Sequence, residues 1–99
     1  MSITLEIQPA FAIAYQQYAD FRPGDILRLY ARTGGPGTGG LFFAIEKDQI
    51  LAEDAVFQVE GLTFTIRPGD FWYFEGGLLG YDERYGEYGF YFHNPRLEE

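Results

Sequence analysis

The sequence predicts a mainly β domain of about seven short strands with one principal helix near its N-terminus. Three observations carry this prediction. Apolar and polar residues alternate over most of the chain, which is the period of a strand with one buried face. Apolar residues follow helical spacing over one long stretch only, residues 9–19. No linker or internal repeat divides the 99 residues, so we expect a single domain over residues 1–99.

The first half of the chain predicts a strand, the helix and then two strands around a glycine-rich loop. Residues 2–7 alternate and predict the first strand. Pro9 suits the first turn of the helix, which we expect to end before Pro23. Residues 27–32 and 41–45 alternate again, and the segment between them, 34–40, holds five glycines and a proline. We therefore expect two neighbouring strands joined by a loop that presents mainly backbone.

The second half predicts a loop, a tight hairpin, a short helix and two closing strands. Residues 46–54 are mostly polar and predict a loop. Strands at 56–59 and 62–66 are separated only by Glu60 and Gly61, a two-residue connection in which we expect Gly61 at positive φ. Asp70 is placed to cap a short helix over residues 71–74. Residues 78–82 and 88–93 predict the last two strands.

Composition and charge exclude several classes of function. The chain has no cysteine, which rules out disulfides, thiolate catalysis and metal sites built on sulfur. It carries 15 acidic and 7 basic residues, a net charge of −8, and no basic patch for nucleic acid. No apolar run approaches the length of a membrane span and no signal-peptide pattern opens the chain, so we expect a soluble cytoplasmic protein that binds neither nucleic acid nor membrane.

Three segments carry a resemblance to a known family. Residues 27–35 resemble the strand that leads into the glycine loop of the HesB-like domain of A-type iron–sulfur carriers. Residues 59–62 resemble that domain's second hairpin, and residues 89–95 resemble its Gly-Phe-x-Phe-x-Asn-Pro segment. Residues 70–76 are similar to a subgroup of short HesB-like proteins of low-GC Gram-positive bacteria. The resemblance implies a mixed sheet curled into a pseudo-barrel, with the first helix packed against it.

The chain departs from this family at the cysteines. The family holds iron or a cluster with one cysteine in the glycine loop and a pair just beyond Asn-Pro. Here Pro36 stands at the loop position, and residues 96–99 supply no thiol after Pro95. Iron–sulfur ligation depends mainly on thiolates. We therefore expect a cysteine-less, non-enzymatic HesB-like relative without an iron–sulfur cofactor, which acts through contact with a protein partner in iron–sulfur biogenesis.

Four residues near the C-terminal hairpin are candidate metal ligands. They are Asp82, Glu83, Glu87 and His93, and carboxylates with one imidazole suit ferrous iron or manganese. A solvated acidic turn and a surface histidine explain the same pattern. The alternative function is therefore a small-ligand or metal-ion binding domain. No nucleophile or general-base pair can be named, which argues against an enzyme.

The aromatic content of 19% is high for a small domain. A domain of this size buries only about two-thirds of the surface of its unfolded chain. We therefore expect some of Phe42, Trp72, Tyr73 and Tyr91 to remain exposed and to form an interface. The prediction is a weak homodimer, opposed by the net charge and therefore tighter at higher salt.

Overall fold

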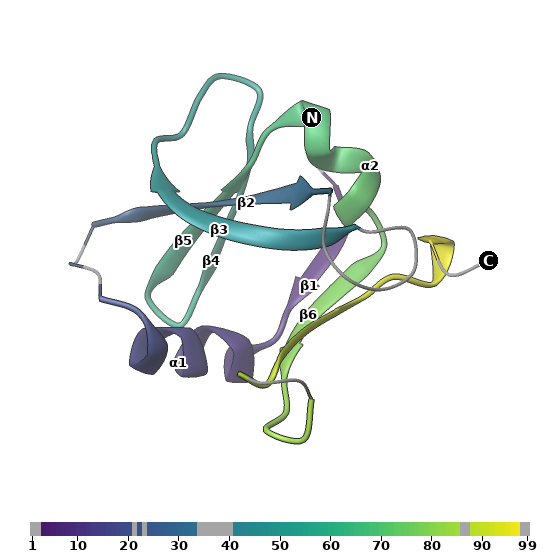
Figure 1. Cartoon of the computed structure of the whole chain (residues 1–99). Coiled ribbons are helices and arrows are strands. Elements are labelled where there is room, and N and C mark those ends of the chain that lie inside the picture. The colour runs from purple at the N-terminus through teal and green to yellow at the C-terminus, as the bar shows by residue number, and fades with distance from the viewer. Residues whose placement is uncertain (1–2, 21, 23, 34–40, 86–87, 98–99) are drawn as a thin grey trace.

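Two β-sheets and one principal helix build the fold (Figure 1). The computed structural model describes residues 3–20, 22, 24–33, 41–85 and 88–97. The elements in chain order are β1 (Leu5–Ile7), α1 (Pro9–Tyr18), β2 (Ile26–Arg32), β3 (Phe42–Asp48), β4 (Ala55–Val59), β5 (Leu62–Ile66), η2 (Pro68–Asp70), α2 (Phe71–Phe74), β6 (Gly77–Tyr81), β7 (Phe90–His93) and η3 (Pro95–Leu97). The predicted mainly β class with one principal helix is confirmed.

Both sheets mix parallel and antiparallel pairs. The larger sheet has the order β3-β2-β5-β4, with β2 antiparallel to β3 and parallel to β5. The smaller sheet has the order β1-β6-β7, with β1 parallel and β7 antiparallel to β6. Among the described residues, β3 and β7 therefore each form an outer edge of their sheet. None of the described helices has the length and apolar character of a transmembrane span.

The hairpin between β4 and β5 has the predicted geometry. Val59 pairs with Leu62, so Glu60 and Gly61 form a two-residue turn. Their φ angles are 50° and 82°, both positive, as a type I′ hairpin turn requires. Gly61 adopts this conformation without strain, whereas Glu60 carries a side chain into it.

The strand β3 is longer than the sequence predicts. Its alternation ends at Ile45, and residues 46–48 were expected in a loop because they are charged. In the structure they continue the pairing with β2, up to Asp48 opposite Ile26. Ion pairs of Asp48 with Arg28 and Arg67 hold this polar end in place. The predicted glycine loop, residues 34–40, lies outside the described residues, although the strands on either side of it pair as expected.

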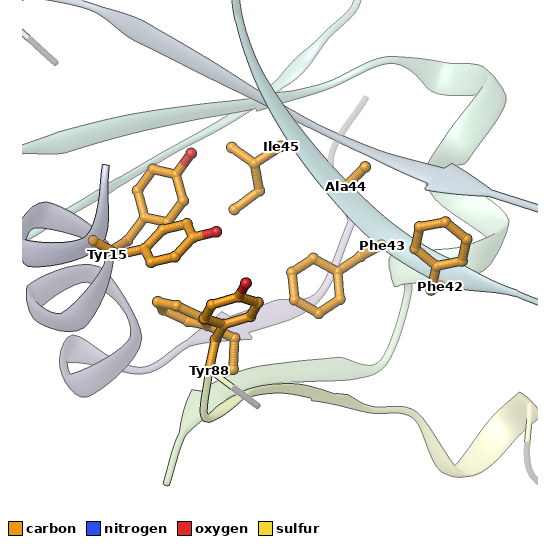
Figure 2. Close-up of a pocket in the computed structure, with 8 residues that line it drawn as sticks. Tyr15, Phe42, Phe43, Ala44, Ile45 and Tyr88 are labelled. Atoms are coloured by element: carbon orange, nitrogen blue, oxygen red, sulfur yellow. The ribbon is translucent and has the colours of Figure 1, made fainter. Parts of the chain in front are cut away.

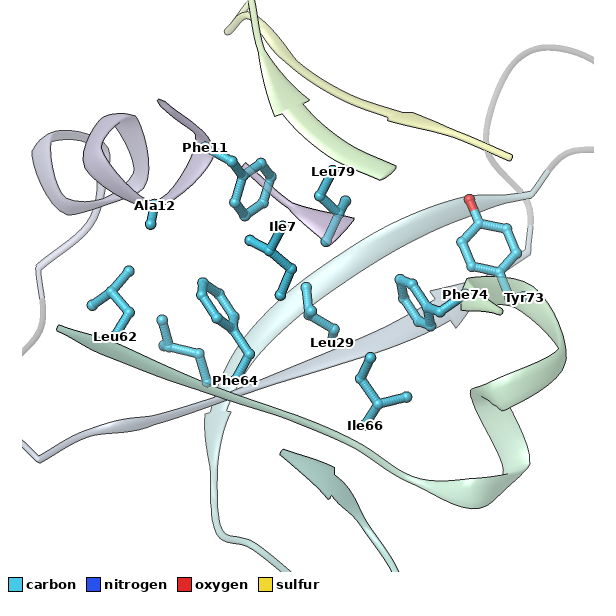
Figure 3. Packing of buried hydrophobic residues seen from close by; sticks show 11 residues of the cluster. Ile7, Phe11, Ala12, Leu29, Leu62, Phe64, Ile66, Tyr73, Phe74 and Leu79 are labelled. Carbon is cyan, nitrogen blue, oxygen red and sulfur yellow. The ribbon is translucent and has the colours of Figure 1, made fainter. Parts of the chain in front are cut away.

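The core lies between the inner faces of the two sheets and α1 (Figure 3). Phe11 of α1, Phe64 of β5 and Leu29 of β2 are fully buried there. Leu79 of β6 meets them from the smaller sheet. The 3.6-residue period of the helix and the two-residue period of the strands thus direct apolar side chains to one shared interior.

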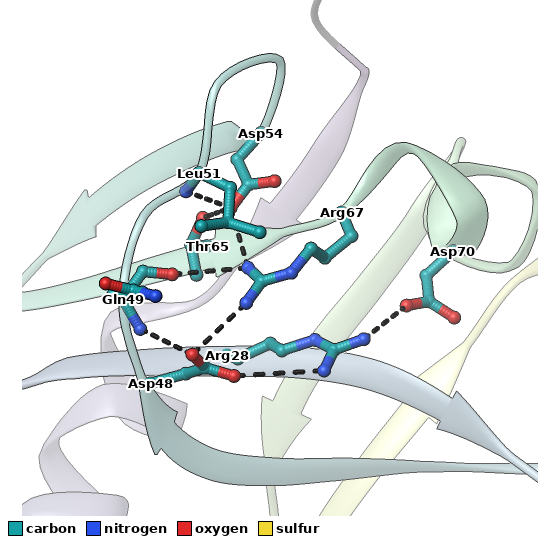
Figure 4. Close-up of polar contacts among 8 residues, drawn as sticks. All are labelled: Arg28, Asp48, Gln49, Leu51, Asp54, Thr65, Arg67 and Asp70. Atoms are coloured by element: carbon teal, nitrogen blue, oxygen red, sulfur yellow. Dashed lines mark hydrogen bonds and ion pairs between the residues drawn. The ribbon is translucent and has the colours of Figure 1, made fainter.

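A cluster of charges covers the opposite face of the larger sheet (Figure 4). Arg67 Nη1 donates to Asp54 Oδ2 at 2.8 Å, and Arg67 Nη2 lies 3.1 Å from an oxygen of Asp48. The Asp54 side chain is fully buried, and its Oδ2 also accepts from the Leu51 N–H and the Thr65 hydroxyl. These bonds fix the segment before β4 over the end of the sheet. Burial acts to raise the pKa of Asp54, but its donors outweigh burial and lower that pKa below the ordinary value.

Asp70 does not act as the expected helix cap. It precedes α2, but its side chain makes no capping hydrogen bond. Its carboxylate instead accepts from the Ala31 N–H at 3.3 Å and lies 3.6 Å from Arg28 of β2. The ion pair with Arg28 and the hydrogen bond from the Ala31 N–H stabilise the Asp70 carboxylate more than capping a four-residue helix would.

Asn94 fastens the end of β7 to the end of α2. Its side chain is buried, and its Nδ2 donates to the carbonyls of Tyr73 and Glu75 at 2.9 and 3.0 Å. Its Oδ1 accepts from the Arg96 N–H at 3.1 Å. Both ends of this amide are therefore used, which fixes where the chain leaves β7.

Candidate functional site

An aromatic groove of about 780 Å³ lies between α1, β3 and the start of β7 (Figure 2). Tyr15 and Tyr18 line it from α1, residues 42–45 line it from β3, and Tyr88 and Phe90 line it from the third side. These segments are far apart in the sequence. The groove therefore exists only because the helix and the two outer strands meet in the folded chain.

The helix presents two tyrosines because they follow the spacing of one helical face. Phe11 is buried, and Tyr15 lies one turn further along, with ring centroids 6.5 Å apart. Tyr18 lies one more turn along, 6.2 Å from Tyr15, and is 56% exposed. The helix thus passes from the core to the solvent along a single aromatic row.

Phe90 forms the floor where these rings meet. Its ring lies 6.0 Å from Tyr15 and 5.6 Å from Tyr18, both in edge-to-face geometry. Tyr88 stands beside Tyr18 at 5.2 Å and is 57% exposed. Edge-to-face pairs at these distances are favourable. Two half-exposed tyrosines therefore pack against each other at the mouth of the groove.

The wall formed by β3 is an edge of a sheet. Phe43 and Ile45 project toward Tyr15 and Tyr88 (Figure 2). Successive side chains of a strand point to opposite faces of its sheet, so a groove in contact with four consecutive residues runs along the strand's edge. Phe43 also packs on Phe92 of β7, with ring centroids 6.4 Å apart.

The described lining of the groove carries no charged side chain. Burial, and to a smaller extent the neighbouring Tyr18, raises the pKa of Tyr15 above its ordinary value, so its phenol is neutral at pH 7. The described lining residues supply apolar area and three hydroxyl groups. The guanidinium of Arg32 lies 5.5 Å from the centroid of the Phe42 ring. Such a lining suits recognition of apolar side chains with a few hydrogen bonds.

The structure does not gather the described candidate metal ligands. Asp82 is bound by Arg84, whose Nη2 lies 2.6 Å from Oδ2, and this hydrogen bond lowers the pKa of Asp82 to about 2. His93 pairs with Leu78, which stands four residues before Asp82, so His93 lies roughly 13 Å from the turn that holds Asp82 and Glu83. Glu87 lies outside the described residues. Within the described part of the chain, no three acidic or histidine side chains lie close enough to share an ion.

The aromatic residues proposed for an interface separate into different environments. Phe42 lines the groove. Trp72 is 49% exposed on α2, as expected, whereas Tyr73 is buried against Phe74 and Phe92. Tyr91 packs on Tyr85 outside the groove lining. Sequence reasoning missed Tyr15, Tyr18 and Tyr88 as site residues, although the helical spacing of the first two was a usable signal.

Comparisons with known proteins connect the chain to one named relative. No family model matches the sequence. A protein of Bacillus subtilis named pyruvate dehydrogenase inhibitor is 30% identical over 73 residues, which is 70% of this chain and 77% of the relative. The solution NMR structure of a protein from Aquifex aeolicus is 25% identical, with a TM-score of 0.55 over 96% of this chain and 95% of that chain. The fold is therefore shared along almost the whole chain.

Proposed function

The chain belongs to the family of the Bacillus subtilis protein named pyruvate dehydrogenase inhibitor, and on this premise we propose that it binds and inhibits a pyruvate dehydrogenase. In this proposal the chain acts through protein–protein contact and not by catalysis. The proposal includes the cytoplasmic location that the sequence predicts. The name of the relative supports the target, and the aromatic groove supports the mode of action.

The observation that carries this mode of action is the pair of half-exposed tyrosines at the mouth of the groove. Tyr18 packs on both Phe90 and Tyr88, so these contacts position the two exposed rings before a partner binds. Tyrosine is enriched among the residues that dominate binding energy at protein interfaces. Pre-positioned rings lower the entropic cost of association.

Inhibition of a purified enzyme tests the proposal. The full chain is added to the pyruvate dehydrogenase complex of Bacillus subtilis, and NADH formation from pyruvate is followed. We expect inhibition that rises with the concentration of the chain and reaches a plateau. Incubating the chain by itself before the assay should not change the inhibition. Unchanged NADH formation at a large molar excess of the chain contradicts the proposed function.

A matched pair of variants assigns the inhibition to the groove. Tyr18→Ala combined with Tyr88→Ala removes both exposed rings and should weaken inhibition by about tenfold or more. Tyr85→Ala is the control, because Tyr85 is 54% exposed but packs on Tyr91 outside the groove lining. Circular dichroism and thermal melts confirm that both variants are folded. Equal inhibition by all three proteins places the contact elsewhere on the chain.

We propose in addition that the fold is the cysteine-less HesB-like pseudo-barrel, related to the carriers of iron–sulfur biogenesis. Three motifs, at residues 27–35, 59–62 and 89–95, occur in the same order as in that family and support this relationship. Anaerobic reconstitution with iron and sulfide should leave the protein colourless after gel filtration, because no thiolate is available. A stable brown species with charge-transfer absorption contradicts this part of the proposal. Elemental analysis of the purified chain tests the alternative of a metal-ion domain.

A further inference from the structure

We propose that the groove receives an extended segment of a partner protein, which pairs with the outer edge of β3 as an added strand. The segment carries apolar side chains at alternate positions and basic residues at its flanks. This inference deepens the proposed function, because it states how the protein partner is held. It rests on the position of β3, the path of the groove and the charge of the chain.

The outer edge of β3 has backbone groups available for pairing. Among the described residues β3 pairs with β2 alone. In an antiparallel pair, alternate residues of each strand direct their N–H and C=O groups away from the partner strand. Natural edges are commonly protected by charged residues, proline or bulges. Residues 42–45 contain no charge and no proline, whereas residues 46–48 are all charged.

The groove follows this unprotected stretch and not the charged one. Its β3 wall consists of residues 42–45, which belong to both faces of the strand. A ligand in the groove therefore lies beside the backbone edge. Four paired residues span roughly 13 Å of strand edge, and an extended peptide can pair with such an edge through main-chain hydrogen bonds. An apolar small molecule would fill the groove but would leave the N–H and C=O groups on the outer edge of β3 without hydrogen bonds.

The opposite wall explains why the added segment needs alternating apolar residues. Tyr15 and Tyr88 face Phe43 and Ile45 across the groove (Figure 2). In an added strand, alternate side chains point to this side and the others point to the solvent. Side chains pointing inward fill the space between β3 and the helix. A segment that is apolar at alternate positions therefore matches both the edge and the wall.

The charge of the chain selects a foreign segment over a second copy. The net charge is −8, so two copies repel each other, and a basic segment is attracted. Past Ile45 the next acid of β3 is Glu46, whereas Asp48 is already paired with Arg28 and Arg67. A basic residue at the flank that passes Ile45 therefore lies beside Glu46, and the net charge of the chain favours basic residues at both flanks.

Synthetic peptides test strand addition directly. The probe is a ten-residue peptide in which valine and phenylalanine alternate with threonine and a lysine stands at each end. Two further peptides have the same side chains, but the first is N-methylated at the odd internal positions and the second at the even ones. Binding to the full chain is measured by NMR titration, together with hydrogen exchange of the amides of residues 42–45.

The expected result is an asymmetry between the two methylated peptides. An added strand turns alternate N–H groups toward β3, and the alternation of side chains fixes which ones these are. One methylated peptide should therefore bind like the parent, and the other at least about tenfold more weakly. The parent should slow amide exchange within residues 42–45. Equal binding by all three peptides, which indicates side-chain capture only, overturns the inference, and so does the absence of binding by the parent.

The outcomes separate this inference from the proposed function. Peptide binding with the expected asymmetry but without inhibition of pyruvate dehydrogenase supports the added strand and contradicts the target. Inhibition without peptide asymmetry supports the target and contradicts the added strand. If the chain self-associates at rising concentration in sedimentation and releases the peptide as it does so, the edge binds a second copy. That result overturns the choice of occupant.

Discussion

Replacing Arg67 with alanine should destabilise the protein by about 3 kcal/mol, because it leaves the carboxylate of Asp54 buried without its cation. The Asp54 side chain has no exposed surface, and Arg67 Nη1 lies 2.8 Å from its Oδ2. Breaking a buried pair by removing one partner costs about 3–5 kcal/mol. The lower value applies because Arg67 is 18% exposed, and because Leu51 and Thr65 still donate to Asp54 in the variant.

Urea unfolding followed by circular dichroism measures this loss, and thermal unfolding should show a melting temperature lower by roughly 12–24 °C for a domain of this size. Arg67→Lys is the first control. It keeps a positive charge but lacks the planar fork that reaches Asp48 and Asp54 together, so its loss should be intermediate. Asp54→Asn in the Arg67→Ala background is the second control. It removes the uncompensated charge and should recover part of the stability.

The dependence on pH follows from the lowered pKa of Asp54. A carboxyl group whose folded pKa lies below its unfolded pKa contributes stability above the unfolded value, near 4, and loses it as the pH falls through the folded value. The difference between wild type and Arg67→Ala should therefore be fully present at pH 7 and smaller in acid. A loss below about 1 kcal/mol at pH 7, or a difference that grows in acid, refutes the assignment of Arg67 as the partner that compensates Asp54.

Three further predictions concern other parts of the molecule. Asn94→Ala removes the three hydrogen bonds of a buried side chain and should cost about 2 kcal/mol in urea unfolding, whereas Arg96→Ala at an exposed position nearby should cost less than about half as much. Gly61→Val should cost on the order of 1 kcal/mol or more, and Glu60→Asn should be neutral or stabilising, because the turn needs positive φ at both positions. Sedimentation at two salt concentrations should show the weak dimer tightening as salt screens the charge of −8, and a monomer at high concentration in both buffers contradicts the dimer.

The alternation of the sequence was sufficient to predict most individual elements. Leu27 and Leu29 face the core and Arg28 faces the other way, as the two-residue period requires. Gly61 stands in the expected hairpin, and the helix begins at Pro9 as predicted. These features depend on a few neighbouring residues, whose own geometry limits the available conformations. The sequence also excluded thiolate chemistry, because the chain has no cysteine.

Contacts across the fold decided what local patterns could not. The polar end of β3 became a strand because Asp48 meets Arg28 and Arg67, and Asp70 left the helix end because Arg28 attracts it. Each pair joins residues that are far apart in the sequence, so the spacing of neighbouring residues cannot predict it.

Local sequence patterns were sufficient to predict the helix, the tight hairpin and most of the strands, and the composition shows that thiol ligands are absent. Only the tertiary structure decided which strands became edges, and it brought Tyr15, residues 42–45 and Tyr88 around one groove. The physical reason is the range of the interactions. A strand's period is written into adjacent residues, but an unpaired edge and a groove depend on which distant segments pack together, and that choice is made by burial of the whole core.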